Sequence, residues 1–180
     1  MYESLKSRPA TPDDAEMLAQ LAAIVFRFAY QSAFESTRQM EQVICEHLSP
    51  IAFRTKISDD QTWCHLGLVD DEPSGFIQIV QSQSPDCLSD ATAPELSKLY
   101  VLPRFHGSGI ASELLNRGIE HAVDSGASQI WLSVWEKNER AQAFYRRHGF
   151  STIGEISILW GGTSFRDCVM TRPTSANRLD

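Results

Sequence analysis

The chain has 180 residues, and domains commonly contain about 100–200 residues, so one domain over residues 1–180 is expected. Its formal net charge of −7 disfavours non-specific binding to nucleic acid, because such binding needs Lys and Arg to neutralise phosphates. The first ten residues, MYESLKSRPA, contain no apolar segment of the kind found in signal peptides, and the apolar run at 21–26 is too short to span a bilayer. We therefore expect a soluble, cytoplasmic protein that binds neither nucleic acid nor membrane.

The cysteines are scattered along the chain at Cys45, Cys64, Cys87 and Cys168, with no CxxC pair. This spacing favours buried, reduced thiols over a disulfide framework or a zinc site. No metal is expected.

The first elements expected from periodicity are a short strand within residues 4–11, a helix over 11–34, and shorter helices over 37–48 and 51–57. Thr11 is the predicted N-cap of the first helix, with Pro12 after it. A hairpin follows from residue 61, with its turn predicted over the segment Asp-Asp-Glu-Pro-Ser-Gly, and then a polar loop over 82–94.

The second half begins with a strand at ELSKLYVLP, a helix over 109–125 and a strand at SQIWLSVW. A helix at NERAQAFYRRH and strands at FSTIGEISIL and SFRDCVMTRP complete the chain, and Gly126 and Gly149 are expected to end the two helices. This order predicts an α/β fold, in which a mixed, mostly antiparallel sheet contains a central β-α-β unit and is flanked by helices.

The segment RFHGSGIASELL, residues 104–115, places two glycines between a strand and a helix. A helix start with free backbone N–H groups is suited to binding an anion, although a tight turn explains the glycines equally well. Known phosphate and nucleophile motifs do not fit. Ser112 replaces the third glycine of a dinucleotide fingerprint, Ile110 follows Gly109 where a P-loop needs Lys, and glycines flank Ser108 too closely for a nucleophile elbow.

The segments LYVLPRFHGSGIASELL and WLSVWEKNERAQAFYRRHGF together resemble the GCN5-related N-acetyltransferase (GNAT) superfamily. The pyrophosphate loop of that family, Q/R-x-x-G-x-G/A, is matched over 106–111 except that His106 replaces Gln or Arg. The resemblance is close over 94–150. The segments ELSKLYVLP, WLSVWEKN and GGTSFRDCVM also resemble a bacterial subgroup that includes spermidine/spermine N-acetyltransferases.

The resemblance implies an N-acetyltransferase that moves an acetyl group from acetyl-CoA to a primary amine of a small molecule, and the subgroup implies a polyamine such as spermidine or spermine. Residues 1–93 would lie mainly on the substrate side, 94–150 would hold acetyl-CoA, and 151–180 would add the last strands. A peptide or protein N-terminus, another small amine, or a non-catalytic acyl-CoA-binding sensor domain remain alternatives, since fold does not fix function. Homodimer formation is left open.

For the cofactor, the resemblance implies that backbone N–H groups at the helix start bind the pyrophosphate, where the helix dipole favours negative charge. The preceding strand would contact the pantetheine, with the N–H of Val101 on the thioester carbonyl. Asn138 would reach the cofactor, although its role as a helix cap explains it as well. The expected cofactor-binding residues are Leu99, Tyr100, Val101, His106, Gly107, Ser108, Gly109, Ile110, Ala111, Ser112, Asn138 and Tyr145.

For the chemistry, the resemblance implies that Tyr145 is the general acid, because a phenol with a pKa near 10 is protonated at neutral pH. Glu95 is the candidate base, and strand alternation predicts that it shares a side with Ser97, Leu99 and Val101. Tyr145 as a packed core aromatic and Glu95 as an exposed strand-end charge are the structural alternatives.

His106 and His148 are bases by chemistry, but their positions favour solvent-facing or helix-terminal roles. Ser133 stands where other family members carry a glutamate. The amine site is expected between residues 28–35 and the 82–94 loop, with Trp135 and Trp160 as apolar walls. Two acidic residues in these segments, Glu35 and Asp86, would attract a cation.

Overall fold

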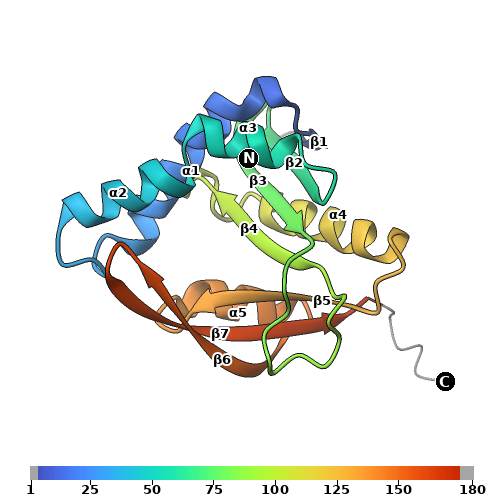
Figure 1. Ribbon diagram of the computed structural model, residues 1–180. Coiled ribbons are helices and arrows are strands. Elements are labelled where there is room, and N and C mark those ends of the chain that lie inside the picture. The colour runs from blue at the N-terminus through green and yellow to red at the C-terminus, as the bar shows by residue number, and fades with distance from the viewer. Residues whose placement is uncertain (1–3, 175–180) are drawn as a thin grey trace.

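The computed structural model describes residues 4–174, which form one seven-stranded sheet with the strand order β1-β2-β3-β4-β5-β7-β6 (Figure 1). Every neighbouring pair is antiparallel except β4 with β5, which is parallel. The predicted mixed α/β fold with helices on its flanks is therefore confirmed.

The N-terminal elements are β1 (Leu5–Pro9), a 3-10 turn η1 (Pro12–Asp14), α1 (Ala15–Tyr30), α2 (Thr37–His47) and α3 (Pro50–Ile57). Thr11 caps this region as expected, in a capping box with Asp14. The carboxylate of Asp14 also accepts two hydrogen bonds of 2.7 Å from Arg8, which lowers its pKa to about 2. The first helix is shorter than predicted, because the 3-10 turn precedes it and it ends at Tyr30.

The hairpin of β2 (Thr62–Val69) and β3 (Glu72–Val80) has a shorter turn than the predicted six residues. Only Asp70 and Asp71 turn the chain, both with positive φ, at 50° and 64°. Two successive residues with positive φ match the twist of antiparallel strands, and aspartate tolerates this conformation better than most residues. Pro73 and Ser74 consequently belong to β3.

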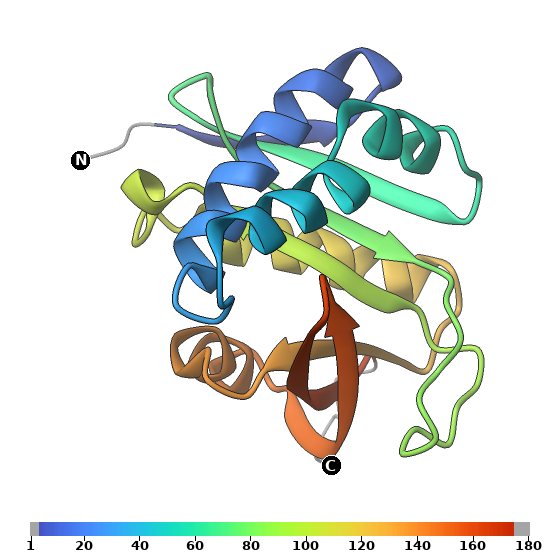
Figure 2. The same ribbon diagram turned by 60° about the vertical axis from the view of Figure 1, so that its left-hand side comes forward.

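The central unit consists of β4 (Glu95–Val101), a 3-10 turn η2 (Pro103–Phe105), α4 (Ile110–Asp124) and β5 (Gln129–Trp135). Figure 2 shows α1 and α2 in front of the sheet and α4 behind it, so the two helical layers cover opposite faces. The core lies between these layers and the sheet, and Leu18 and Phe26 of α1 and Leu114 of α4 are almost completely buried.

The chain ends with α5 (Glu139–Arg147), β6 (Ser151–Trp160) and β7 (Thr163–Pro173), and β7 inserts between β5 and β6. The Asn138 side chain caps α5 by accepting a hydrogen bond of 3.2 Å from the N–H of Ala141. Gly126 and Gly149 follow α4 and α5 with φ of 78° and 84°, as expected for helix ends.

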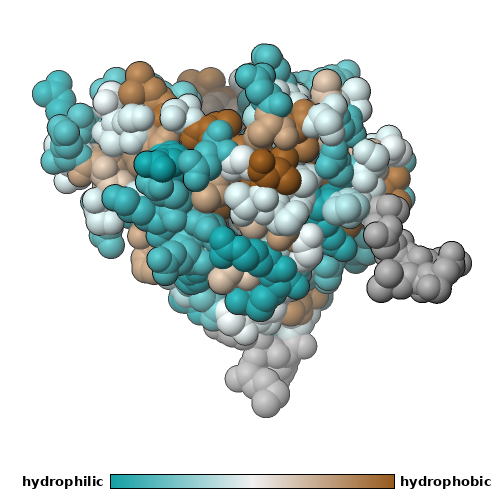
Figure 3. All heavy atoms as spheres, turned by 90° about the horizontal axis from the view of Figure 1, so that it is seen from below, coloured by the Kyte–Doolittle hydropathy of each residue, from teal (hydrophilic) through white to brown (hydrophobic). Residues whose placement is uncertain are grey.

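The four cysteines are all free; Cys64 is buried, Cys168 is partly buried, and Cys45 and Cys87 are exposed. The expectation of four buried thiols was therefore wrong for Cys45 and Cys87, and Cys168 is buried only in part. Hydrophilic side chains cover most of the face seen from below in Figure 3, with hydrophobic side chains in smaller patches between them. Within residues 4–174, no helix has the length and apolar character needed to cross a bilayer.

Candidate active site

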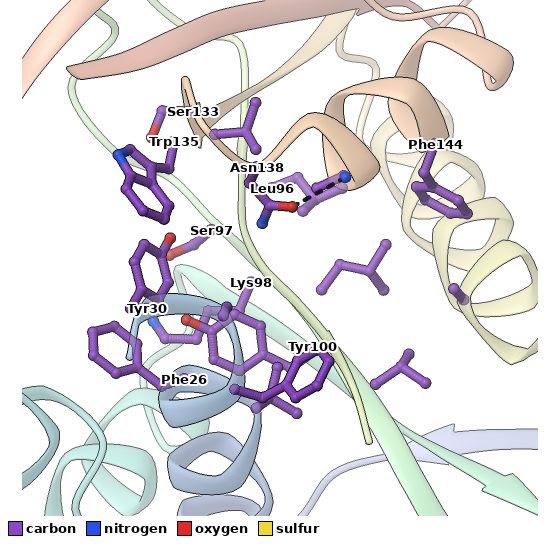
Figure 4. A pocket seen from close by; sticks show the side chains of 18 of the residues that line it. Phe26, Tyr30, Leu96, Ser97, Lys98, Tyr100, Ser133, Trp135, Asn138 and Phe144 are labelled. Carbon is purple, nitrogen blue, oxygen red and sulfur yellow. Dashed lines mark hydrogen bonds between the residues drawn. The ribbon is translucent and has the colours of Figure 1, made fainter. Parts of the chain in front are cut away.

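The strands β4 and β5 pair only at one end and then separate. Their register contains a single pair of residues, Glu95 with Trp131, and the Trp131 N–H donates a hydrogen bond of 3.1 Å to the Pro94 carbonyl. A cavity of about 1200 Å³ opens beyond this point, lined by both strands and by residues of α1, α4 and α5 (Figure 4). A ligand in this cavity can therefore reach the edges of two strands that do not bond each other.

The loop before α4 presents backbone donors to this cavity. Gly107 and Gly109 have φ of 85° and 95°. Within residues 4–174, the N–H groups of Gly107, Gly109 and Ala111 donate no hydrogen bond, whereas the Ser112 N–H donates to the Gly109 carbonyl at 3.0 Å. A side chain at Gly107 would meet no atom within 4 Å. Free donors beside open space fit an anion such as a pyrophosphate.

The backbone of β4 also turns donors toward the cavity. The Leu102 N–H donates to the Ser74 carbonyl of β3 at 2.8 Å. In an antiparallel pair, successive residues point their N–H groups to opposite sides, so the N–H groups of Val101 and Leu99 face away from β3. That is the side on which β5 has separated from β4.

A β-bulge in β4 changes the face on which Glu95 lies. Lys98 pairs with Gln78 and Leu96 pairs with Ile79, so Ser97 is an extra residue. Glu95 therefore shares a face with Lys98 and Tyr100. The expectation that Glu95 lies on the same face as Leu99 and Val101 was wrong, because the extra residue at the bulge moves Glu95 to the opposite face.

Tyr145, which is buried, and Tyr100, which is half-buried, both line the cavity. Tyr145 is 8% exposed and packs against Phe150, with ring centres 5.6 Å apart. Burial raises the pKa of Tyr145 and that of Tyr100, so both phenols keep their protons at neutral pH. No atom of residues 4–174 makes a hydrogen bond with the Tyr145 hydroxyl, which leaves its proton available to a ligand.

The expected apolar walls are present on one side of the cavity. Trp135 and Trp160 both line it, and Tyr30 stacks on Trp135 at a centroid distance of 5.4 Å (Figure 4). Glu35 is exposed and does not line the cavity.

The 82–94 loop does not line the cavity either, contrary to expectation. Leu88 and Ala93 pack with Trp131 and Val169 in a separate small cluster, and the Trp131 indole N–H donates to the Ala93 carbonyl at 3.2 Å. These contacts hold the loop beside the closed end of the strands, where Asp86 lines a different, shallow hollow.

Several charged residues that line the cavity were not predicted, and Asp167 and Lys98 are two of them. Asp167 of β7 is 7% exposed, accepts a hydrogen bond of 3.2 Å from the Ser133 hydroxyl, and has a pKa raised by desolvation. Lys98 donates a hydrogen bond of 3.2 Å to the Gln78 side chain, and desolvation lowers its pKa. The sequence contained one signal for Asp167. Alternate residues of β7 lie on one buried face, where apolar side chains such as Phe165 and Val169 are expected, and Asp167 is a charged residue between them.

The two histidines proposed as alternative bases are both held by neighbours. His106 Nδ1 lies 2.7 Å from Arg140 Nη1, and His106 Nε2 lies 3.1 Å from the Val101 carbonyl. His148 bridges the Phe144 carbonyl at 2.9 Å and the Ser112 hydroxyl at 3.1 Å, which ties α5 to α4.

Of the expected site residues, Ser108 and Ile110 do not line the cavity, and the Ile110 side chain is completely buried in the core. The other expected residues, Glu95 included, line the cavity together. The sequence thus identified the two strands, the loop and the helix that surround it.

Residues 25–150 match the family described as the acetyltransferase (GNAT) family. The chain belongs to this family. An uncharacterized N-acetyltransferase of Mycobacterium tuberculosis is 32% identical over 159 residues, which cover 88% of this chain and 97% of the relative. The streptothricin acetyltransferase of Streptomyces lavendulae is 30% identical over 107 residues, covering 59% of this chain and 53% of the relative.

Solved structures of GNAT proteins share the fold. The PaiA N-acetyltransferase of Thermoplasma acidophilum, crystallised in complex with coenzyme A, superposes with a TM-score of 0.77 at 22% identity, covering 95% of this chain and 99% of that one. A nourseothricin acetyltransferase superposes with a TM-score of 0.66 at 21% identity, covering 96% and 100% of the two chains. This GNAT protein is thus an acetyltransferase by family.

Proposed function

We propose that this GNAT protein transfers the acetyl group of acetyl-CoA to a primary amine of a small molecule. The observation that carries the proposal is the separation of β4 from β5 next to three unbonded N–H groups at the start of α4. The coenzyme A complex of the PaiA relative supports the choice of cofactor. Residues 94–150 hold acetyl-CoA in this account, and residues within 4–93 and 151–174 supply walls of the amine compartment.

The chain offers two sets of backbone groups for acetyl-CoA. We assign the N–H groups of Gly107, Gly109 and Ala111 to its pyrophosphate, because glycines permit close approach and the helix start favours negative charge. We assign the Val101 N–H to the thioester carbonyl, since it faces away from β3. Bound acetyl-CoA supplies the activated acetyl group.

Two side chains would move protons. Tyr145 keeps its phenolic proton at neutral pH because burial raises its pKa, and it is the proposed donor for the leaving sulfur. Glu95 lines the same cavity and is the proposed acceptor of the proton that the attacking amine loses, directly or through water.

For the acceptor, we propose a polyamine such as spermidine or spermine. The resemblance of three segments to the bacterial polyamine subgroup supports this choice, as do the aromatic wall of Tyr30, Trp135 and Trp160 and the buried Asp167 beside it. Aromatic faces and carboxylates both attract ammonium groups.

The test is an acetylation panel with spermidine, spermine, butylamine and a peptide with a free N-terminus. A polyamine acetyltransferase uses the polyamines with a clearly higher kcat/KM than butylamine, which offers the same nucleophile without the additional charges. Equal use of butylamine, or activity on the peptide alone, would contradict the choice of a polyamine as the acceptor. The proposal that the protein transfers acetyl groups would remain. Tight binding of coenzyme A without acetylation of any amine would instead indicate a sensor domain.

A further inference from the structure

Asp167 is a buried carboxylate that the described chain leaves without a cation. Its hydrogen-bond donor is the neutral Ser133 hydroxyl, and within residues 4–174 no Lys, Arg or His nitrogen lies within 4 Å of its oxygens. Arg166, its neighbour in β7, pairs instead with Glu136 at 3.4 Å and Glu155 at 3.7 Å. Because buried charges are normally paired, Asp167 is suited to a positively charged ligand group.

The surroundings of Asp167 also suit a cation. It lines the cavity and lies opposite Trp135 in the pairing of β5 with β7. Figure 4 shows Ser133, Trp135 and Tyr30 together on one side of the pocket, away from Phe144. Lys137 Nζ lies over the Trp135 ring, 6.0 Å from its centre, which shows that this aromatic wall attracts ammonium groups in the same direction as the carboxylate.

The position of Asp167 differs from that of the proposed base. Glu95 is level with Trp131 of β5, whereas Asp167 is level with Trp135. Four strand residues at about 3.3 Å each separate these levels by about 13 Å along β5. One amine nitrogen therefore cannot contact both carboxylates.

The two carboxylates therefore have different roles. The proposed function places the reacting nitrogen beside Glu95, the proposed base. A cation paired with Asp167 is too far from Glu95 to give its proton to that base, so it is a group that binds without reacting.

We propose that Asp167, oriented by Ser133, binds a second, non-reacting ammonium group of the acceptor, and thereby selects long-chain diamines and polyamines over monoamines. The proposal rests on the proposed function, which it deepens by naming the residue that determines specificity. No covalent step occurs at Asp167.

The test compares octylamine with 1,8-diaminooctane, which are matched in chain length and differ in the second ammonium group. Calorimetry measures the binding of each to the coenzyme A complex of the protein. The wild type should bind the diamine at least about tenfold more tightly, because a charge-assisted contact is lost with octylamine. In Asp167→Asn, which keeps the shape and removes the charge, this preference for the diamine over octylamine should disappear.

Three further variants make the result specific. Asp167→Glu restores the charge and should restore part of the preference, and Asp167→Ser provides a second neutral variant. Asp86→Asn removes an exposed carboxylate outside the cavity and should change nothing. Unchanged affinity for acetyl-CoA shows that each variant retains its fold.

A wild type without preference for the diamine, or an Asp167→Asn variant that keeps the preference, overturns the proposal. The acetylation assay on the same samples separates this result from the proposed function. Acetylation of octylamine without any diamine preference overturns only the role of Asp167. Diamine binding that depends on Asp167 but yields no acetylated product supports that role and contradicts the proposed acetyl transfer.

Discussion

Arg140 Nη1 donates a hydrogen bond of 2.7 Å to His106 Nδ1 and so connects the start of α5 to the residue that follows η2. Arginine has no acceptor, so Nδ1 carries no proton and Nε2–H donates to the Val101 carbonyl at 3.1 Å. The imidazole is therefore neutral in this arrangement. Desolvation, and then the charge of Arg140, lower the pKa of His106.

This contact predicts a pH dependence of stability. Because the pKa of His106 is lower in the folded chain than in the unfolded chain, the unfolded chain binds the proton first as the pH falls below about 6.5. The free energy of unfolding should therefore fall as the pH drops from about 6.5 toward the folded pKa. His106→Gln should lose less stability over this range in urea unfolding experiments between pH 8 and pH 5. Desolvation also lowers the pKa values of His65 and His121, but both residues are present in the wild type and in His106→Gln. Equal losses of unfolding free energy in the two proteins would therefore contradict the role of His106.

Gly107 provides a charge test of the anion site. Its φ of 85° is tolerated by Asn and Asp better than by other side chains, and a side chain there meets no atom within 4 Å. Gly107→Asp should weaken acetyl-CoA binding by at least about tenfold relative to Gly107→Asn, because only Asp adds a negative charge beside the proposed pyrophosphate site. Calorimetry measures both affinities. Equal affinities in two folded variants would show that phosphates bind elsewhere.

The proposed acid is tested with two tyrosines that line the same cavity. Tyr145→Phe keeps the ring and removes the proton, so kcat should fall by roughly 10²–10⁴ while acetyl-CoA affinity stays the same. Tyr100→Phe removes another phenolic hydroxyl of the same cavity and should have a much smaller effect. Single-turnover kinetics measure the chemical step. A Tyr145→Phe variant as fast as the wild type would make Tyr145 a structural residue.

The order of the elements and the positions of β4, β5 and the Gly107–Gly109 loop followed from the sequence, because periodicity, turn residues and helix caps are local signals. Other features depend on contacts between distant segments. The bulge at Ser97 is defined only by the pairing of β4 with β3, and it moves Glu95 to the other face. The Asp70–Asp71 turn is shorter than expected because two adjacent aspartates adopt positive φ, which composition alone does not specify.

In the candidate site, too, the features set by contiguous residues could be predicted, and those set by contacts between distant segments could not. The cofactor loop could be predicted because its residues are contiguous in the chain. The amine side combines Tyr30, Trp135, Trp160 and Asp167 from four elements, and only the sheet order brings β7 next to β5. The assignment of the 82–94 loop to this side was wrong, since contacts with Trp131 hold it elsewhere.

The base is tested by Glu95→Gln, which preserves size and removes the proton acceptor. The variant should lower kcat by roughly 10²–10⁴ at neutral pH, and should bind acetyl-CoA as the wild type does. Glu46→Gln changes an exposed carboxylate at the rim of the same cavity and serves as the matched control. Similar rates for Glu95→Gln and Glu46→Gln, measured where chemistry limits turnover, would assign the proton transfer to another group.

The central claim is that the cavity between β4 and β5 transfers acetyl from acetyl-CoA to an amine. Its most direct test is a single-turnover experiment, in which acetyl-CoA labelled in the acetyl group is mixed with excess protein and spermidine, and the products are identified by mass spectrometry. The account predicts that the label appears on a spermidine nitrogen as coenzyme A is released, and that Tyr145→Phe slows this step. Label that remains on coenzyme A with spermidine and with every other amine tested, in a protein that binds acetyl-CoA tightly, would contradict it.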